Sequence, residues 1–382
     1  MRPKRANERI AILAMALAID LLWGEPPEPV HPVVWIGRLI GGLEERAASS
    51  PRHPSEETPA GGAAPTTSQN CPIGSNSPGR RERPEGARKS GRGLLSGRPA
   101  AEFTAGLAIV GATIVCAAGS AILLERLAGR MPWLLRVAVV AVALKPLLAV
   151  RALFAAVADV ERPLLRGDIP AARAAAARIV SRDVSTLDSP LLAAAAIESL
   201  AENLSDSVVA PCCAFLLGGL PLAAAYRAAN TLDAMLGYRG AKEYLGKPAA
   251  KLDDVLNLVP SRLAAALLVA ASPAVGASPR RVALAAWGDR RRTASPNAGW
   301  PMSAVAAALG RCLEKRGHYR LYPAGSEPVP HDVRRARRLA AGALVLAGLL
   351  AALAGGLPPA LEQVSVRKTA AATAPSAGQW RR

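Results

Sequence analysis

Long runs without a charged side chain limit the fold of this chain more than any other feature. Residues 104–124 contain no Asp, Glu, Lys or Arg, and a helix of that length spans about 30 Å, the thickness of the hydrocarbon core of a bilayer. Residues 339–357 form a second such run, which ends at Pro358 and Pro359. Because a membrane-embedded backbone has to satisfy its hydrogen bonds within the protein, both runs are predicted to be membrane-spanning helices.

Three further apolar runs are interrupted. Residues 207–226 carry no charge but contain two prolines and the pair Gly218-Gly219, so we expect a kinked or re-entrant segment. Residues 263–279 are short and contain prolines, and residues 133–154 contain one Lys and two Arg, which argues against a lipid-facing helix. We therefore predict an all-α, multi-pass integral membrane protein with about four to six spans.

Composition divides the chain into four parts. Residues 1–49 are predicted to be an N-terminal membrane segment that contains the motif HPV, and residues 102–363 a helical membrane core with a polar block at 181–262. Residues 50–101 are rich in Pro, Gly, Ser and Arg and nearly free of large apolar side chains, so we expect a disordered basic loop. Residues 364–382 are expected to be a disordered tail for the same reason.

The net charge of +18 is concentrated beside the apolar runs. The basic clusters lack interleaved aromatic residues on which bases would stack, so nucleic acid is not an expected partner. Lys and Arg beside membrane helices are typical of cytoplasmic flanks, which predicts a multi-pass protein of the cell (inner) membrane whose polar block faces the cytoplasm. The basic residues are Arg2, Lys4, Arg5 and Arg9 before the first run, and Arg334, Arg335, Arg337 and Arg338 before the last.

The N-terminus leaves two interpretations open. Basic residues followed by IAILAMALAI resemble a secretory signal, and the stretch Ala16-Leu17-Ala18 would serve as its cleavage site. The apolar run continues past these small residues through Asp20 to Trp23, which favours a retained membrane segment.

The polar block contains three carboxylates at intervals of four residues, in the stretch ESLAENLSDSVVAP at 198–211. On a helix, Glu198, Glu202 and Asp206 lie on one face, with Asn203 beside them. Like charges at this spacing repel one another, so the stripe costs stability unless a cation or a substrate group lies among the carboxylates.

Polar side chains recur in three other segments next to the broken apolar runs. They are Arg182, Asp183 and Asp188 in SRDVSTLDSP, Tyr226, Asn230 and Asp233 in YRAANTLDAMLGY, and Asp253, Asp254, Asn257 and Arg262 in KLDDVLNLVPSR. Interhelical hydrogen bonds of roughly 0.6–2 kcal/mol each, or a solvated acidic face, would explain any one residue. Neither explains so many carboxylates with accompanying amides, because each buried charge costs a few kcal/mol. Oxygen-rich clusters of this kind suit Mg²⁺ that carries nucleotide phosphates.

These motifs, in this order, resemble one family. RDVSTLD, ESLAEN followed by SDSVVAP, YRAANTLDAMLGYRG, KLDDVLNLVPSRL and SPNAGWP are arranged as in the cobalamin-biosynthesis membrane proteins called CbiB or CobD, the adenosylcobinamide-phosphate synthases. The stretch LAIDLLWGEPPEPVHPVVWIGRLI is similar to the opening of that family, and the resemblance covers residues 10–46 and most of 102–325. Departures from the family pattern are Glu25, where Asp is usual, Ser207 for Gly, Ala234 for Ser and Lys251 for Arg.

The resemblance implies a reaction and its participants. The reaction is ATP-dependent amide formation between the free propionate of adenosylcobyric acid and aminopropanol or its phosphate, which gives adenosylcobinamide or its phosphate. ATP and Mg²⁺ are implied as cofactors, and a corrinoid, the amine, membrane lipid and other membrane proteins of the pathway as partners. A phosphate-binding loop is not evident, because GAKEYLGKP at 240–248 has five residues between its glycines and ends in Pro248 where Ser or Thr is needed.

This chemistry assigns hypothetical roles to the polar residues. Asp253 and Asp254 would hold Mg²⁺, and one of Glu198, Glu202 or Asp206 would be the base that deprotonates the amine. The predicted catalytic set is Glu198, Glu202, Asp206, Asn203, Asp183 and Asp233. The predicted substrate-binding set is Arg182, Asp188, Asn230, Asn257, Arg262, His31 and Trp300, with Arg182 and Arg262 on phosphate. A structural hydrogen-bonding role for His31 and a membrane-interface role for Trp300 remain open.

Two functions of other classes remain as alternatives. A transporter of a corrinoid or a cation would also use broken helices with acidic residues at their breaks, but its polar clusters should fall in two corresponding halves rather than in one contiguous block. A non-enzymatic membrane scaffold or sensor would not need carboxylates in register, so charge-neutral substitutions there should be silent.

Overall fold

The structure is a computed structural model that describes residues 3–27, 29, 31–48, 99–237 and 243–356. The predicted disordered loop at 50–101 lies outside these residues except for its last part, 99–101, which belongs to a helix. The predicted disordered tail at 364–382 also lies outside the described residues.

The described chain is almost entirely helical, which confirms the predicted all-α class. The first helices are α1 (Pro3–Trp23), α2 (Pro32–Ala48), α3 (Pro99–Ala128), α4 (Trp133–Leu144), α5 (Val150–Leu165), α6 (Ile169–Ala176), α7 (Ser189–Leu204) and α8 (Ala210–Leu236). They are followed by α9 (Glu243–Leu256), α10 (Leu258–Ala271), α11 (Pro279–Asp289), α12 (Gly299–Leu309) and α13 (Pro330–Gly356). Short helices of other kinds are η2 (Lys145–Leu147), the π-helix η3 (Ser205–Val209) and η4 (Ser272–Val275).

One small antiparallel hairpin, β1 (Leu313–Lys315) with β2 (Tyr319–Leu321), is not predicted by the sequence. Strands of three residues are too short to show an alternating pattern, so periodicity gives no signal for them. Gly317, with φ of 75°, supplies the left-handed backbone that the turn needs.

Five helical segments of the described chain are long and apolar enough to cross a membrane, in agreement with the multi-pass prediction. They are Pro99–Ala128, Trp133–Leu165, Ser189–Leu236, Leu258–Val275 and Pro330–Leu353. Both uninterrupted runs of the sequence are among them, and so are the three interrupted ones, whose breaks are described below.

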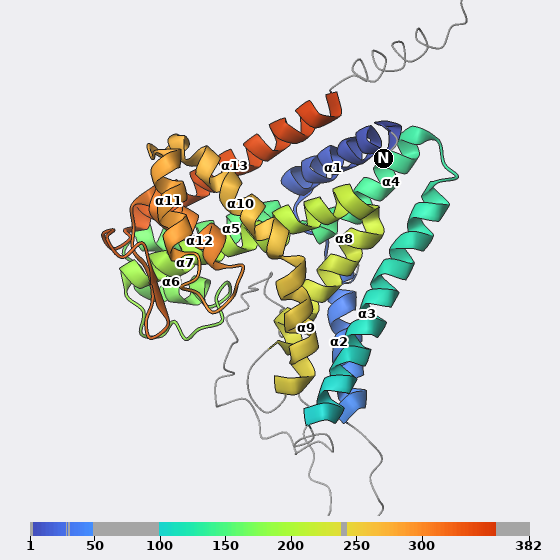
Figure 1. Ribbon diagram of the computed structural model, residues 1–382, viewed down its shortest axis with the longest axis horizontal. Helices are drawn as coiled ribbons and strands as arrows, with labels where there is room; N and C mark the ends of the chain where they lie inside the picture. The colour runs from blue at the N-terminus through green and yellow to red at the C-terminus, as the bar shows by residue number, and fades with distance from the viewer. Residues whose placement is uncertain (1–2, 28, 30, 49–98, 238–242, 357–382) are drawn as a thin grey trace, which may run out of the picture.

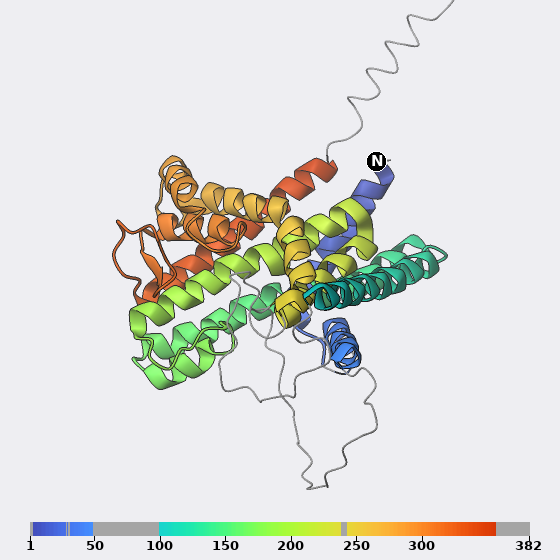
Figure 2. The same ribbon diagram turned by 60° about the horizontal axis from the view of Figure 1, so that its bottom comes forward.

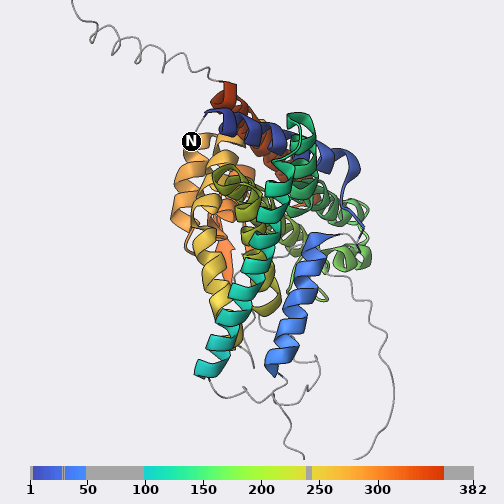
Figure 3. The same ribbon diagram turned by 90° about the vertical axis from the view of Figure 1, so that its right-hand side faces the viewer.

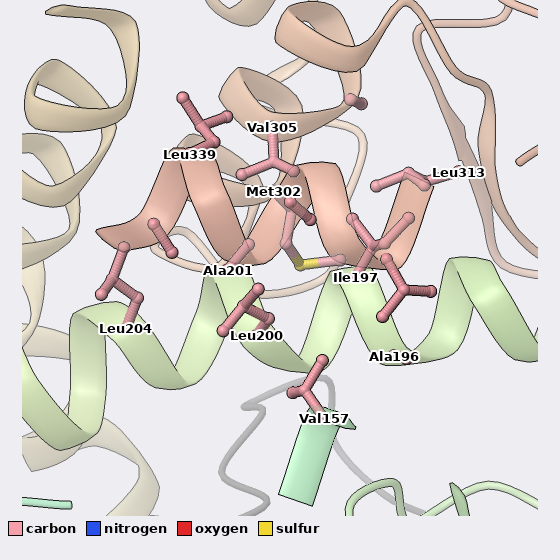
Figure 4. Close-up of a cluster of buried hydrophobic side chains, with 14 of the residues drawn as sticks. Val157, Ala196, Ile197, Leu200, Ala201, Leu204, Met302, Val305, Leu313 and Leu339 are labelled. Atoms are coloured by element: carbon pink, nitrogen blue, oxygen red, sulfur yellow. The ribbon is translucent and has the colours of Figure 1, made fainter. Parts of the chain in front are cut away.

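Helix α7 lies at the centre of the largest hydrophobic cluster. In Figures 1 and 2 it runs between α5 on one side and α10, α12 and α13 on the other. Figure 4 shows Ile197 and Leu200 of α7 facing Met302 and Val305 of α12, with Val157 of α5 on the opposite side. The many alanines of α7 let these neighbours approach closely, so the acidic residues of this helix are enclosed by protein rather than by lipid.

Helix α8 folds back on itself at Gly219, as the prediction of a kinked or re-entrant segment requires. This residue has φ of 74° and ψ of −163°, a conformation that only glycine adopts readily. A straight helix would place residues 206 and 226 about 30 Å apart, whereas the hydroxyl of Tyr226 lies 3.0 Å from the carbonyl oxygen of Asp206. The second half of α8 therefore returns along the first half.

Charged side chains from two other helices satisfy the backbone at this reversal. Arg9 of α1 donates to the carbonyls of Leu216 and Leu217, where the first half of α8 ends. Glu125 of α3 accepts the N–H of Leu220, where the second half begins, at 2.8 Å. Each charge also has the sign that the nearby helix dipole favours.

Charged side chains also satisfy the backbone at the break between α4 and α5. Asp20 of α1 accepts the N–H of Arg151 at the start of α5, and the Arg151 guanidinium donates to the carbonyls of Leu21 and Leu22 at the end of α1. Lys145, at the break itself, is 4% exposed and lies 3.4 Å from Asp20. The charge that made residues 133–154 doubtful as a lipid-facing helix is therefore paired inside the protein.

The two basic flanks lie at opposite ends of the α4–α5 segment. At the N-terminal side, Glu8 pairs with Arg136 in the first turn of α4, whereas Arg334 and Arg337 of α13 pair with Glu161 near the end of α5. Figure 1 shows the N-terminus beside α4 and the start of α13 at the far end. The side of the membrane that each flank faces stays a prediction.

Helices α2, α3 and α9 extend side by side toward one end of the molecule, away from α11, α12 and the hairpin (Figures 1 and 3). Leu236 and Leu245, from α8 and α9, pack with Ile40 of α2 and Ile109 of α3 in a separate small cluster. The polar residues of α8 and α9 therefore lie between this cluster and the large one around α7.

We expect Gly219→Ala to destabilise the protein by about 1–3 kcal/mol, because alanine avoids this conformation. A Cβ at this position would also lie 2.7 Å from Oε1 of Glu125. The measurement is the thermal midpoint in detergent, with Gly119→Ala of α3 as the control, since a Cβ there meets nothing within 4 Å. Equal midpoints for the two variants would contradict the assigned role of Gly219.

Candidate active site

A π-helix at the junction of α7 and α8 opens the backbone beside the acidic stripe. In η3, Ala210 donates its N–H to the carbonyl of Ser205, and Pro211, the next residue in that pattern, has no N–H to give to Asp206. The carbonyl of Asp206 instead accepts the hydroxyl of Tyr226. The proline thus explains why the returning half of α8 docks here.

Buried carboxylates converge around Asp206. The negative charges of Glu202, Asp233 and Asp253 all act on this residue, and each of the four side chains is less than a tenth exposed. They come from α7, η3, α8 and α9, so the folded chain gathers what the sequence spreads over about fifty residues. We call this group the carboxylate cluster (Glu202, Asp206, Asp233 and Asp253).

Amide side chains hold Asp253 in place. Nδ2 of Asn230 donates to Oδ1 of Asp253 at 3.2 Å, and Nδ2 of Asn257 donates to Oδ2 at 3.0 Å. Burial raises the pKa of Asp253 to about 6, and these two donors act against the rise. The predicted pairing of an amide with a carboxylate thus has a direct physical basis for Asn230 and Asn257, whereas Asn203 donates to the carbonyl of Ser199 at 2.9 Å.

A chain of hydrogen bonds continues from the carboxylate cluster in two directions. The Tyr226 hydroxyl lies 2.9 Å from Oδ1 of Asn257, which joins η3 to the end of α9. Arg227 donates to Oδ1 of Asn230 and to the Ser207 hydroxyl, both at 3.4 Å, and Ser207 donates to Asn203 at 3.5 Å. Ser207 therefore takes part in the network even though the family usually has glycine there.

Glu198, one turn before Glu202 in α7, begins a second group that includes residues of the hairpin. Nη2 of Arg182 donates to Oε2 of Glu198 at 3.0 Å. Tyr319 of β2 is hydrogen-bonded to Glu198, and the charge of Lys315 in β1 also acts on Glu198. Burial raises the pKa of Tyr319, and the charges of Glu198 and Glu202 raise it further, so Tyr319 stays a proton donor.

Sequence reasoning missed Tyr319 and Lys315 because they lie far beyond the polar block, in a hairpin that gives no pattern. It also missed Asn297 as a separate residue, although SPNAGWP marks the position. Nδ2 of Asn297 donates to the carbonyl of Asp254 at 2.7 Å, and its Oδ1 accepts Nη1 of Arg262 at 2.8 Å. Asn297 thus connects the start of α10 to the segment before α12.

Two predicted site residues, Asp183 and Asp188, lie outside these groups. Asp183 is exposed and accepts the N–H and hydroxyl of Ser185, which lower the pKa of Asp183. Asp188 caps α7 by accepting the N–H of Leu191 and lies 3.4 Å from Arg316. In these positions Asp183 shapes a turn and Asp188 stabilises a helix end, so neither joins the carboxylate cluster.

His31 belongs to the N-terminal break rather than to the carboxylate cluster. Its Nε2 lies 3.1 Å from Glu25, which also accepts Nζ of Lys145 at 2.8 Å. Its Nδ1 accepts the N–H of Val33 at the start of α2. The structural role left open for His31 is therefore the one that its contacts display, and Glu25 fills the place of the usual Asp.

The two members of the predicted magnesium pair, Asp253 and Asp254, have different surroundings. Both oxygens of Asp253 accept amide donors, and its backbone neighbour Asp254 is only partly buried. Among the described residues, no three His, Cys, Asp or Glu side chains converge on one metal position. Since Mg²⁺ that carries nucleotide phosphates is usually held by only one or two carboxylates, the magnesium prediction for Asp253 and Asp254 stays a prediction, and no chemical step is assigned to the ion.

A cavity of about 10 Å³ lies beside Asn203, room for about one water molecule. Ser199 and Ser207 supply further polar groups to its wall, and Ala149 and Val157 close the other side. The N–H of Ala149 bonds to the carbonyl of Ser207, which connects the α4–α5 break to the π-helix.

Comparison with known proteins identifies the family. The family model described as CobD/Cbib protein matches residues 85–342. A cobalamin biosynthesis protein CobD of Dehalococcoides mccartyi (strain CBDB1) is 37% identical over 315 residues, which cover 82% of this chain and 87% of that protein. A second, from Rhodobacter capsulatus, is 37% identical over 367 residues, which cover 90% and 98%.

No solved structure matches the chain. The sequence resemblance noted above is confirmed by both the family model and the curated relatives. The matched region contains every member of the carboxylate cluster together with Arg182, Glu198 and Tyr319. This chain belongs to the CobD/Cbib family.

Proposed function

We propose that this chain catalyses ATP-dependent formation of an amide bond between the free propionate of adenosylcobyric acid and aminopropanol or its phosphate. A role in cobalamin biosynthesis follows from the family, since the relatives are named for it. The observation that carries the chemistry is the convergence of buried carboxylates with Arg182, Lys315 and several amides inside a membrane protein. Such a set is costly for stability alone and suited to a polar substrate.

Glu202 is the best-placed base for this reaction. Amide formation requires that the attacking amine lose a proton, and a positioned carboxylate assists this transfer by on the order of 10² to 10⁴-fold. Glu202 acts electrostatically both on Asp206 and on Tyr319, so within the carboxylate cluster it lies on the side that faces the Glu198 group. A proton taken up at Glu202 can therefore be shared with either side.

Arg182 and Lys315 supply positive charge where the reaction builds negative charge. The propionate needs activation, which ATP supplies as phosphate, and both the phosphate and the tetrahedral intermediate are anionic. Arg182 is held by Glu198 and Lys315 lies within reach of the same carboxylate. These two cations come from different segments, so they can grip a ligand from two sides.

We place the site toward the cytoplasmic face of the cell membrane, where ATP is available. Arg311, just before β1, pairs with Asp332 at the start of α13, so the hairpin and the basic flank of α13 lie at one end. Clusters of arginine beside a membrane helix favour the cytoplasmic side. Association with other membrane proteins of the pathway stays a prediction.

The first test feeds intermediates to cells that lack this chain. If the chain forms the amide, these cells should grow when given cobinamide but not when given cobyric acid. Reintroducing the chain should restore growth on cobyric acid. Growth on cobyric acid without the chain would contradict the proposal, and purified protein that moves a corrinoid across vesicles without ATP or amine would favour a transporter.

Glu202→Gln should lower the rate of amide formation by about 10² to 10⁴-fold, because it keeps the shape of the side chain and removes the base. The measurement is product formation by purified protein, detected by mass spectrometry. The matched control is Glu314→Gln, which removes a surface carboxylate paired with Arg320 in the hairpin. A full rate for Glu202→Gln, present in membranes at the normal level, would rule out this role.

Tyr319→Phe should lower the same rate by about tenfold, the scale of one hydrogen bond to a charged group. The hydroxyl that bonds Glu198 would be lost while the ring remains. Tyr244→Phe, at an exposed ring of α9, is the control and should leave the rate unchanged. Equal rates for both variants would remove Tyr319 from the site.

A further inference from the structure

Two arginines lie over the same tryptophan ring at the surface near the carboxylate cluster. The guanidinium carbons of Arg262 and Arg290 are 5.0 Å and 5.4 Å from the ring centre of Trp300. Trp287 meets Trp300 edge-on at a centroid distance of 5.5 Å, and Arg290 also lies 3.6 Å from the ring centre of Trp287. We call these four side chains the Trp–Arg cluster (Arg262, Trp287, Arg290 and Trp300).

The Trp–Arg cluster holds two positive charges that no carboxylate of the described chain neutralises. Arg262 donates only to uncharged acceptors, which are the carbonyls of Leu258 and Pro296, the Ser261 hydroxyl and Oδ1 of Asn297. Arg290 donates to the carbonyl of Trp287. The charge of Arg290 acts on Arg262, so the two cations repel each other as they stand.

The nearest acidic residue in sequence is already occupied. Asp289 pairs with Arg292 at 2.6 Å and accepts the N–H of Tyr322 at 2.6 Å. Other arginines that pack into the described chain meet an acid, as Arg334 and Arg337 do at Glu161, or the backbone carbonyls at a helix break, as Arg9 does. In the Trp–Arg cluster, Arg262 and Arg290 are held in place by aromatic rings as well as by uncharged acceptors.

The Trp–Arg cluster is connected to the candidate active site through Asn297, so its ligand is expected to be a ligand of that site. Asn297 joins Arg262 to the carbonyl of Asp254, one residue from Asp253 of the carboxylate cluster. Guanidinium groups fixed in a plane bind phosphate oxygens with two parallel hydrogen bonds. A phosphate bound here would neutralise both arginines and would be linked through Asn297 to the part of α9 that carries Asp253.

We propose that the Trp–Arg cluster binds a phosphate group carried by a soluble substrate, either the nucleotide or the phosphorylated amine. The identity of the phosphate-bearing substrate rests on the proposed function. Phosphate binding itself does not require that function. A corrin ring stacked on Trp300 would have to displace a guanidinium, so the Trp–Arg cluster favours phosphate over the corrin face. Trp300 is then a support for the arginines.

The test measures binding of inorganic pyrophosphate to the full chain in nanodiscs of phosphatidylcholine, by isothermal titration calorimetry. Arg290→Gln should weaken binding by about tenfold or more, the effect of losing a charge-assisted hydrogen bond. Arg291→Gln is the matched control, because it removes the same charge from the next residue, which is exposed and over neither ring. It should change the affinity less than about twofold.

Equal losses in the two variants would overturn the proposal, since general positive charge would then suffice. Arg290→Lys keeps the charge without the planar fork and should also bind several-fold more weakly, whereas unchanged affinity would contradict the geometry. The Arg290→Lys variant also keeps the proposal testable if Arg290→Gln lowers the thermal midpoint of the protein.

A second arm separates substrate phosphate from a lipid headgroup. Nanodiscs containing phosphatidylglycerol should leave pyrophosphate affinity within about twofold, and its loss there would assign the Trp–Arg cluster to anionic lipid and overturn the proposal. If Arg290-dependent binding is found but no amide forms, the proposed function fails while the phosphate site stands.

Discussion

The fold depends on charged side chains that satisfy broken helices in apolar surroundings. A membrane-like interior offers no water to the backbone, so each break needs a partner for its free N–H and C=O groups. Arg9 and Glu125 serve the reversal of α8, and Asp20 with Arg151 serve the α4–α5 break. Helix α1 contributes to both, which fixes the two breaks relative to each other. Pro211 likewise leaves the carbonyl of Asp206 without a helical donor. The Tyr226 hydroxyl donates to this carbonyl, which brings Tyr226 and the amides to the carboxylates.

The site therefore uses backbone geometry as much as side-chain chemistry. The π-helix η3 and the fold-back at Gly219 bring α8 against its own beginning, so residues 206 and 226 meet. Without that reversal, Asp233 and Asp253 would have no reason to lie near Glu202. The small residues of α7 then let α5, α12 and α13 close around it, which excludes lipid from the acids.

Sequence reasoning reached the apolar spans, the break in α8 and the register of Glu202 and Asp206, because helical periodicity and proline or glycine positions report these directly. It did not reach Tyr319 or Lys315, since contacts between a short hairpin and α7 leave no local pattern. Asp188 shows a different limit: Asp before Ser-Pro is a helix-capping signal, yet the same carboxylate also suited a binding role. The side of the membrane that each basic flank faces stays a prediction, because it depends on the path of α4–α5, which local composition does not report.

The hairpin that carries Tyr319 is synthesised well after α7, the helix whose Glu198 it contacts. A ribosome makes α7 more than a hundred residues before β2, so Glu198 and Glu202 are synthesised before Lys315 and Tyr319. Arg182, only slightly upstream of α7, is already available and pairs with Glu198. The order of residues along the chain thus gives Glu198 a positively charged partner early in synthesis. Glu202 is enclosed only when the C-terminal third of the chain has been made.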